Sequence, residues 1–224
     1  MARLFLLGSG QNKGSDLLDL LFAHLIRNGH LLYIPIAEQF NRTGYSLEYK
    51  RLQGIFHPLG VKSITMWDSI FSKSHSDLQP FNGTYIGGGN TFKLLHDIQN
   101  SNFSPLLHRF LSQDGIIYGA SAGAIILGKS IRTASHLDDN YIKQTNMNGF
   151  NLLHGHSVWP HYHHTEDAQV YSYTHHHHEP VIAISERTGL FVDGDLAIVV
   201  GHEPVYVFTS HGKRTYSPSS VVSF

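Results

Sequence analysis

The stretch Gly115-Ile-Ile-Tyr-Gly-Ala-Ser-Ala-Gly-Ala-Ile125 joins an apolar run to a run of small residues. The apolar run favours a buried strand, and the small residues after it favour a helix that packs closely against that strand. A sharp turn between the two lifts a serine hydroxyl out of the end of a sheet, and only small neighbours permit so close an approach. The stretch therefore predicts an α/β fold with a nucleophile elbow at Ser121; the alternative is a strand-to-helix turn without chemistry.

The composition excludes several classes of protein. The 224 residues carry 16 Lys and Arg against 17 Asp and Glu, so no strong field attracts nucleic acid or an anionic membrane. Without cysteine the chain has no disulfide, thiol nucleophile or Cys-ligated zinc. No apolar run approaches the roughly 20 residues of a membrane helix. We expect a single soluble, cytoplasmic domain over residues 1–224 that has no nucleic-acid or membrane partner.

Strand-like and helix-like patterns alternate along the first half of the chain. We expect strands at residues 4–7, 31–36, 63–67, 84–86 and 116–118, and helices at 17–26, 47–56, 91–98 and 105–111. This βαβ cadence predicts a mostly parallel sheet with helices on both faces. Residues 131–167 are polar and weakly periodic, as in long loops, and short strands at 181–184, 189–192, 197–200 and 205–209 predict an antiparallel extension of the same sheet.

A serine nucleophile needs a histidine to accept its proton and a carboxylate to orient that histidine. Asp138 and Asp139 follow the elbow helix, and His161 follows Trp159-Pro160, whose proline stiffens the backbone. Spacing alone does not choose among the nine histidines from His154 to His178.

Four motifs in matching order resemble the peptidase E (aspartyl dipeptidase) family of serine peptidases, which has cyanophycinase-like relatives. They are Ile86-Gly-Gly-Gly-Asn-Thr-Phe92, Gly119-Ala-Ser-Ala-Gly-Ala124, Ser130-Ile-Arg-Thr133 and Trp159-Pro-His-Tyr162. The resemblance implies a three-layer α/β/α sandwich like that of class I glutamine amidotransferases. It implies Ser121 as the nucleophile, His161 as the base, and an oxyanion hole formed by the amides of Gly88 or Gly89 and of Ala122.

The chain departs from the family pattern at two points. The best-known spacing of the family's acid falls on His136, so the resemblance leaves Asp138 or Asp139 as the acid, with Asp139 preferred. No Arg or Lys lies between Lys143 and Arg187, where aspartate-selective members place a cation. Either a histidine of this region supplies the cation, or Arg132 reaches the site from elsewhere, or the enzyme is not strictly specific for aspartate. Arg132 and Asn90 are the candidates for substrate binding.

The predicted function is hydrolysis of short peptides, including those with an N-terminal Asp, through a Ser-His-Asp triad and an acyl-enzyme. No metal or cofactor is expected, and the protein is expected to be a monomer or a small homo-oligomer. Because an imidazole must be neutral to accept a proton, activity should fall in acid.

Three alternatives remain open, together with one local prediction. The chain could be a non-catalytic relative that binds ligands, or a phosphate-binding protein built on Gly123-Ala-Ile-Ile-Leu-Gly-Lys-Ser130. It could also be a metal-dependent hydrolase, with ligands drawn from His154, His156, His161, His163, His164 and Asp167. The run His175 to His178 is expected to be an exposed polar loop.

Overall fold

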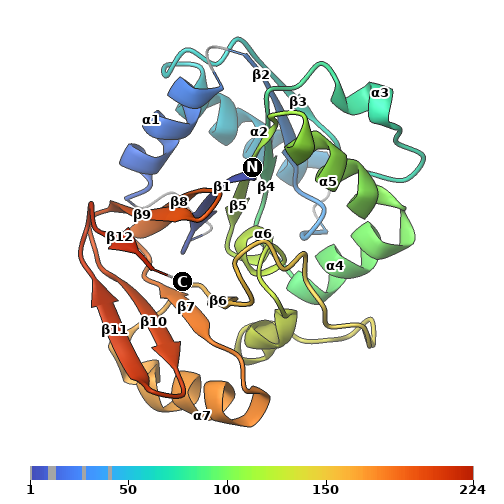
Figure 1. The fold of residues 1–224 in the computed structure, drawn as a ribbon. Helices are drawn as coiled ribbons and strands as arrows, with labels where there is room; N and C mark the ends of the chain where they lie inside the picture. The colour runs from blue at the N-terminus through green and yellow to red at the C-terminus, as the bar shows by residue number, and fades with distance from the viewer. Residues whose placement is uncertain (1, 10–13, 27–28, 40–41, 224) are drawn as a thin grey trace.

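The computed structural model describes residues 2–9, 14–26, 29–39 and 42–223. Among these residues, eight strands form one sheet in the order β12-β9-β8-β1-β5-β4-β2-β3 (Figure 1). The strands are β1 (Arg3–Leu7), β2 (His30–Ile34), β3 (Ser63–Met66), β4 (Gly83–Ile86), β5 (Ile116–Ala120), β8 (Thr188–Asp193), β9 (Leu196–Gly201) and β12 (Val221–Val222). Strands β1 to β5 pair in parallel, whereas β8, β9 and β12 extend the sheet antiparallel from β1.

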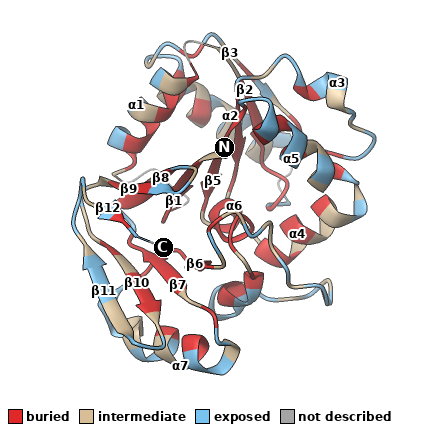
Figure 2. Cartoon of the chain, viewed as in Figure 1, coloured by how far each residue is buried: buried red, intermediate tan, exposed pale blue. Residues whose placement is uncertain are grey.

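Helices cover both faces of this sheet because side chains on each strand alternate between two apolar cores. Phe5, Tyr85 and Tyr118 pack on one face with α1 (Asp16–Leu25) and α2 (Arg42–Phe56). Leu6 and Ile117 pack on the other face with helices of the central chain segment. Those helices are α3 (His75–Leu78), α4 (Thr91–Asn100), α5 (Phe103–Ser112) and α6 (Ala122–Ile125). Figure 2 shows the buried strands between the two helical layers, and the predicted three-layer α/β/α fold is confirmed.

Four further strands among the described residues form a second sheet in the order β11-β10-β7-β6. They are β6 (Ser157–Trp159), β7 (Val181–Ile184), β10 (Val205–Thr209) and β11 (Gly212–Tyr216). The sequence interpretation was therefore wrong to place residues 181–184 and 205–209 in the main sheet, while 189–192 and 197–200 do extend it. The reason is burial: Ile182 and Ile184 pack against the main core, and Val181 and Ala183 pack on the opposite side.

The opposite side of the second sheet is covered by α7 (Asp167–His177), a helix that the sequence interpretation missed. Its buried residues Val170, Tyr173 and Thr174 have the i, i+3, i+4 spacing of one helical face. Lys213 of β11 pairs with Asp167 at the helix start, with Nζ 2.8 Å from Oδ1. The histidine run predicted as a loop forms the last turn of α7, and His178 is its left-handed C-cap.

The polar segment before α7 also contains short regular elements. Two 3₁₀ helices, η1 (Ile131–His136) and η2 (His164–Glu166), flank β6 within the region expected to be loop. Across the described ranges, no helix combines the length and apolarity needed to cross a bilayer.

Candidate active site

Ser121 lies at a sharp turn between β5 and α6. Its backbone has φ 50° and ψ −111°, an unusual conformation for a residue with a side chain. Its N–H donates to Leu7 O, 3.1 Å away, which fixes the turn to the end of β1. A Cβ on Gly123 would lie 2.2 Å from Ile86 O, and one on Gly119 would lie 2.4 Å from Gly123 O. The small residues of the motif are therefore required for α6 to approach the sheet.

His161 reaches Ser121 from the second sheet. It follows the end of β6, has φ 56°, and donates its backbone N–H to Gly8 O at 2.8 Å. Its Nε2 lies 2.7 Å from Ser121 Oγ. Consecutive carbonyls at the end of β1, those of Leu7 and Gly8, thus hold the backbones of both residues.

Glu186 is the carboxylate beside His161, with Oε1 2.5 Å from Nδ1 of the imidazole. Strands β6 and β7 are parallel, with Trp159 opposite Ala183, so residues that follow the two strands meet at one edge. A carboxylate only accepts hydrogen bonds, so Nδ1 carries the proton and Nε2 is left to accept from the serine. An unbroken chain of hydrogen-bond contacts therefore runs from Ser121 through His161 to Glu186.

Asp138 and Asp139, the expected acids, lie elsewhere. Asp138 Oδ2 accepts from Thr91 N at 2.8 Å, and the backbone oxygen of Asp139 accepts from Asn90 Nδ2 at 2.8 Å. Both interactions bind the loop after η1 to the start of α4. The Asp138 carboxylate is thus occupied by Thr91 N and not by His161. The carboxylate that contacts His161 is therefore that of Glu186, while the Asp138 carboxylate contacts Thr91 N.

The sequence contained one signal for Glu186. A polar Ser185-Glu186 pair directly follows a fully apolar strand, which is where functional side chains gather in parallel sheets. The parallel pairing of β6 with β7 has no local signature, and the resemblance directed the search to the segment before His161.

His136 occupies the position at which the best-known family spacing places the acid. Its ring stacks on Trp159 with centroids 3.9 Å apart, and its Nδ1 donates to Thr133 O at 2.7 Å. Burial lowers the pKa of His136 in spite of the nearby carboxylate of Glu166. This histidine is therefore a neutral wall next to the site.

The amides predicted for the oxyanion hole belong to Gly88, Gly89 and Ala122. Within the described residues, none of the three N–H groups has a hydrogen-bond acceptor. Gly89 has φ +128°, and a Cβ there would lie 2.7 Å from the carbonyl carbon of Ala37. The neighbouring Asn90 caps α4, with its Oδ1 2.9 Å from Lys93 N, so its side chain has a structural partner.

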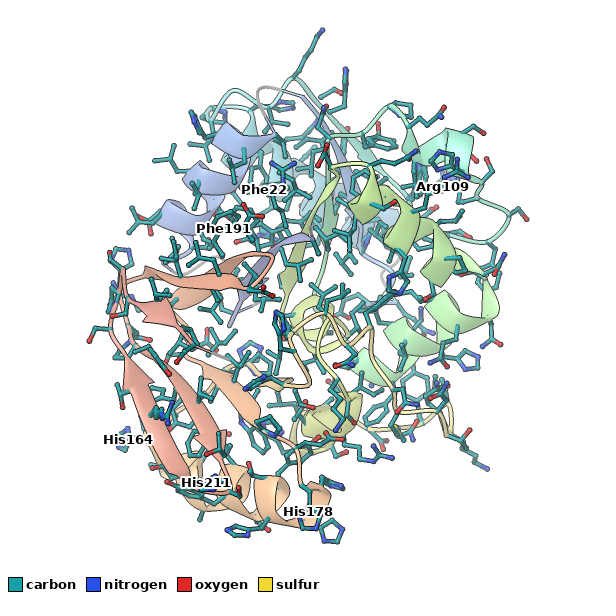
Figure 3. The ribbon with its side chains drawn as sticks, viewed as in Figure 1. Phe22, Arg109, His164, His178, Phe191 and His211 are labelled. Atoms are coloured by element: carbon teal, nitrogen blue, oxygen red, sulfur yellow. The ribbon has the colours of Figure 1, made fainter. Side chains whose placement is uncertain are left out.

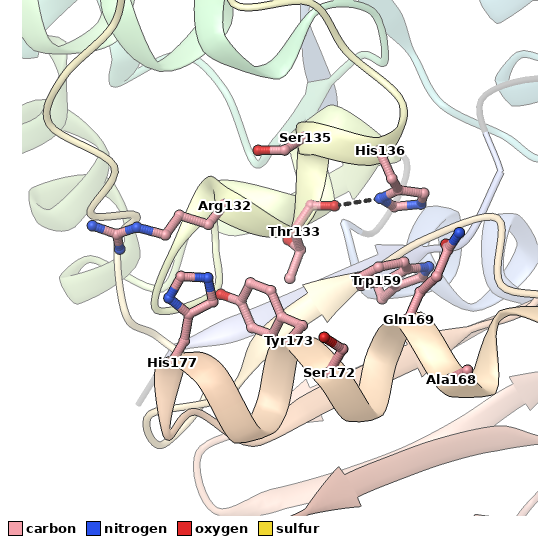
Figure 4. Close-up of a pocket in the computed structure, with 10 residues that line it drawn as sticks. All are labelled: Arg132, Thr133, Ser135, His136, Trp159, Ala168, Gln169, Ser172, Tyr173 and His177. Carbon is pink, nitrogen blue, oxygen red and sulfur yellow. Dashed lines mark hydrogen bonds between the residues drawn. The ribbon is translucent and has the colours of Figure 1, made fainter.

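The second substrate-binding candidate, Arg132, is exposed and lines a cavity of about 670 Å³ (Figure 4). Its Nη1 donates to Ser130 Oγ at 3.1 Å. The cavity lies between η1, β6 and α7. Its lining residues are Arg132, Thr133, Ser135, His136, Trp159, Ala168, Gln169, Ser172, Tyr173 and His177.

The structure does not assemble the alternative metal site. Among the described residues, no three His, Cys, Asp or Glu side chains are grouped so that they could hold a metal ion. His156 contacts Leu153 O and His163 contacts Thr165, whereas His161 contacts Ser121. Figure 3 shows His164, His178 and His211 at different places along the outer end of the second layer.

The phosphate-loop alternative also lacks its geometry. The residues that would form the loop begin inside α6, and Lys129 Nζ lies 3.6 Å from Glu179 Oε1. A phosphate loop would instead join a strand to a helix that starts at its Lys-Ser pair.

Comparisons with known proteins agree with the motifs. "Peptidase E" of Shewanella denitrificans is 32% identical over 152 residues, which are 61% of this chain and 60% of that protein. "Probable alpha-aspartyl dipeptidase" of Drosophila melanogaster is 28% identical over 137 residues, 57% of each chain. The chain thus aligns with less than two thirds of the length of either relative.

A solved structure and a family profile extend the comparison to most of the chain. The crystal structure of a peptidase from an acI-B1 Actinobacterium has a TM-score of 0.79 at 19% identity, and covers 100% of this chain and 97% of its own, which shows a shared fold. The profile of "Peptidase family S51" matches residues 4–200, which include Ser121, His161 and Glu186. The chain therefore belongs to peptidase family S51.

Proposed function

We propose that this protein is a serine peptidase that hydrolyses short peptides, with Ser121 as nucleophile, His161 as base and Glu186 as the orienting acid. The observation that carries the proposal is the continuous contact from Ser121 Oγ to His161 Nε2, 2.7 Å, and from His161 Nδ1 to Glu186 Oε1, 2.5 Å. These are the distances and the order of roles that an activated serine requires.

The reaction follows from these roles. His161 Nε2 takes the hydroxyl proton as Ser121 Oγ attacks the peptide carbonyl, and Glu186 stabilises the imidazolium that forms. The free amides of Ala122 and of Gly88 or Gly89 donate to the oxyanion. His161 then gives its proton to the leaving amine, which breaks the C–N bond and leaves an acyl-enzyme. Water attacks that ester with His161 as base, and Ser121 recovers its proton.

The substrate class is supported by the relatives. Their names describe peptidase E and alpha-aspartyl dipeptidase activity, so dipeptides of the form Asp-X are the first compounds to test.

The test compares the purified protein with its Ser121→Ala variant on a panel of dipeptides with Asp, Glu, Asn or a neutral residue first. Loss of a serine nucleophile lowers kcat by roughly 10⁵–10⁶. Ser112→Ala, on the distant helix α5, should leave the rate unchanged. The same assays after treatment with a chelator complete the design. If Ser121→Ala keeps the activity while the chelator abolishes it, the serine mechanism is refuted in favour of a metal-dependent one.

A further inference from the structure

The cavity beside the site has a buried floor and an exposed rim. Thr133, Trp159 and Tyr173 form the floor, with 1%, 4% and 8% of their surface exposed. Arg132 and Ser135 from η1, together with exposed residues of α7, form the rim. A volume of about 670 Å³ is well above what one aspartate side chain fills and is typical of pockets that bury whole small ligands.

Two of the three floor residues of the cavity are aromatic. The Trp159 indole is covered on one face by His136 and meets the ring of Tyr173 at 75°, with centroids 6.3 Å apart. The hydroxyl of Tyr173 is directed away, since it donates to Glu179 Oε2 at 2.8 Å. Burial raises the pKa of Tyr173 to about 12, so its ring is a neutral wall.

The side chains that line the cavity carry little charge, and that charge is positive. The described residues that line it include no carboxylate. Figure 4 shows Arg132 and His177 at one end, and Trp159, His136 and Gln169 at the other. Burial lowers the pKa of His177, and the neighbouring His176 and Arg132 lower it further, so Arg132 is the cation that remains at neutral pH.

Two polar atoms in the floor lack partners. Among the described residues, Trp159 Nε1 and Thr133 Oγ1 are buried without a hydrogen bond. An unpaired buried donor is destabilising, and an acceptor oxygen from a bound ligand would remove that cost. Gln169 is exposed and lines the same cavity as Trp159, so we expect a substrate oxygen that displaces its side chain to reach this donor.

The cavity is connected to the candidate active site through both of its main elements. Trp159 precedes His161 by two residues, and η1 follows α6, whose N-cap is Ser121. Burial lowers the pKa of His136, which lines the cavity, and His161 lies close enough to lower that pKa further. The cavity wall is therefore next to the residue that contacts Ser121.

We propose that the cavity is the side-chain subsite of this peptidase, and that it takes a bulky uncharged residue flanking the scissile bond in place of an acidic one. The aromatic floor packs the side chain, and Arg132 donates hydrogen bonds to a carbonyl or carboxylate oxygen of the substrate. Lys and Arg side chains are disfavoured because no carboxylate pairs with them. The substrate class rests on the proposed serine mechanism, whereas binding to the cavity does not.

Binding can be measured without turnover. Trp67 and Trp159 are the two tryptophans of the chain, so the Ser121→Ala, Trp67→Phe double variant reports on Trp159 alone. Its fluorescence is titrated with Phe-Ala, Ala-Phe, Asp-Ala and Lys-Ala. We expect the lowest dissociation constant for one of the two phenylalanine peptides. Burying one large apolar side chain corresponds to roughly tenfold to hundredfold in affinity. The matching variant with Trp159→Phe, which keeps Trp67, should show no such response.

A new cation in the cavity tests specificity. Ser172→Arg places a guanidinium at the rim, and His175→Arg places one on the same helix away from the cavity. With X-Ala and Ala-X panels, Ser172→Arg should raise kcat/KM for Asp relative to Phe at least ~tenfold in one panel, and His175→Arg should change neither. The panel that responds identifies which side of the scissile bond the cavity serves.

The outcomes separate the two proposals. Peptide-dependent Trp159 fluorescence without turnover of any peptide by the wild type supports the cavity as a binding site and refutes the proposed function. Turnover with an Asp preference that Ser172→Arg does not alter, or no Trp159 response at saturating peptide, overturns the subsite.

Discussion

The two sheets contribute differently to the site. The eight-stranded sheet supplies Ser121 through a turn whose shape is set by adjacent residues, Gly119 to Gly123. The four-stranded sheet supplies His161 and Glu186, which lie 25 residues apart and meet because β6 and β7 pair in parallel. The difference shows that the conformation of Ser121 depends on local sequence, whereas the contact between His161 and Glu186 depends on assembly of a second layer.

The layers meet at the end of β1. Leu7 O and Gly8 O accept from the backbones of Ser121 and His161, and both of these residues have positive φ. Non-glycine residues in such conformations persist where surrounding bonds hold them, and they cluster at functional sites. A small displacement at this junction, the end of β1, would therefore move Ser121 away from His161.

The sharpest way to break the comparison is Glu186→Gln. The amide keeps the shape of the side chain but no longer stabilises an imidazolium, and it can hold His161 in the wrong tautomer. Loss of the orienting acid can lower kcat by ~10⁴, while Trp159 emission and thermal unfolding should stay close to wild type because the Glu186 side chain is half exposed.

Asp138→Asn and Asp139→Asn are the matched controls for that measurement. Because Asp138 and Asp139 contact Thr91 and Asn90 and not His161, each substitution should change kcat by less than about tenfold. If Asp139→Asn lowered kcat as much as Glu186→Gln does, Asp139 and not Glu186 would be the orienting acid.

Gly8→Ala tests the junction itself. A Cβ at Gly8 would lie 2.2 Å from Ser185 O and 2.7 Å from Ile184 O, so the end of β1 must move away from the end of β7. A misplacement of about 1 Å can lower the rate about 10²-fold, and kcat should fall more than KM rises. Gly54→Ala in α2 is the control, because its Cβ meets no atom within 4 Å and alanine favours a helix interior by about 0.5–1 kcal/mol.

Wild-type kcat in Gly8→Ala, with unfolding also unchanged, would show that the two layers adjust independently. A stability loss with unchanged kcat would assign Gly8 to packing alone.

These differences also explain what the sequence could predict. The βαβ cadence, the Ser121 turn and the Gly88-Gly89 segment depend on neighbouring residues, and the predicted elements of the first half match the structure to within a few residues at their ends. Glu186 was missed because strand pairing between β6 and β7 is non-local. Helix α7 was missed because its histidines hide the spacing of Val170, Tyr173 and Thr174.

The smallest effect concerns the face of the main sheet away from the second layer. Asp19 is 3% exposed, and its oxygens accept from Ser15 Oγ at 2.7 Å and from Tyr118 Oη at 2.8 Å. Burial raises the pKa of Asp19 to about 6, although both hydrogen bonds oppose the shift. Between about pH 4 and pH 6 the folded state therefore holds a proton that the unfolded state has released, so stability contributed at this site is present at low pH and is lost as the pH rises through that window.

Asp19→Asn should remove this dependence, because the amide does not ionise. The free energy of unfolding of the variant, relative to wild type, should rise by up to roughly 3 kcal/mol between pH 4 and pH 7, as urea denaturation at the two pH values would measure. Asp16→Asn on the same helix is a control of opposite sign, because the hydrogen bond with His202 lowers the pKa of Asp16. Activity of Asp19→Asn at neutral pH should stay near wild type, since Asp19 contacts β5 at Tyr118 and not at the serine turn. A stability difference that stays constant from pH 4 to pH 7 would show that Asp19 ionises in the folded protein as it does in the unfolded chain. The buried face of the main sheet would then carry no pH dependence to compare with the candidate site.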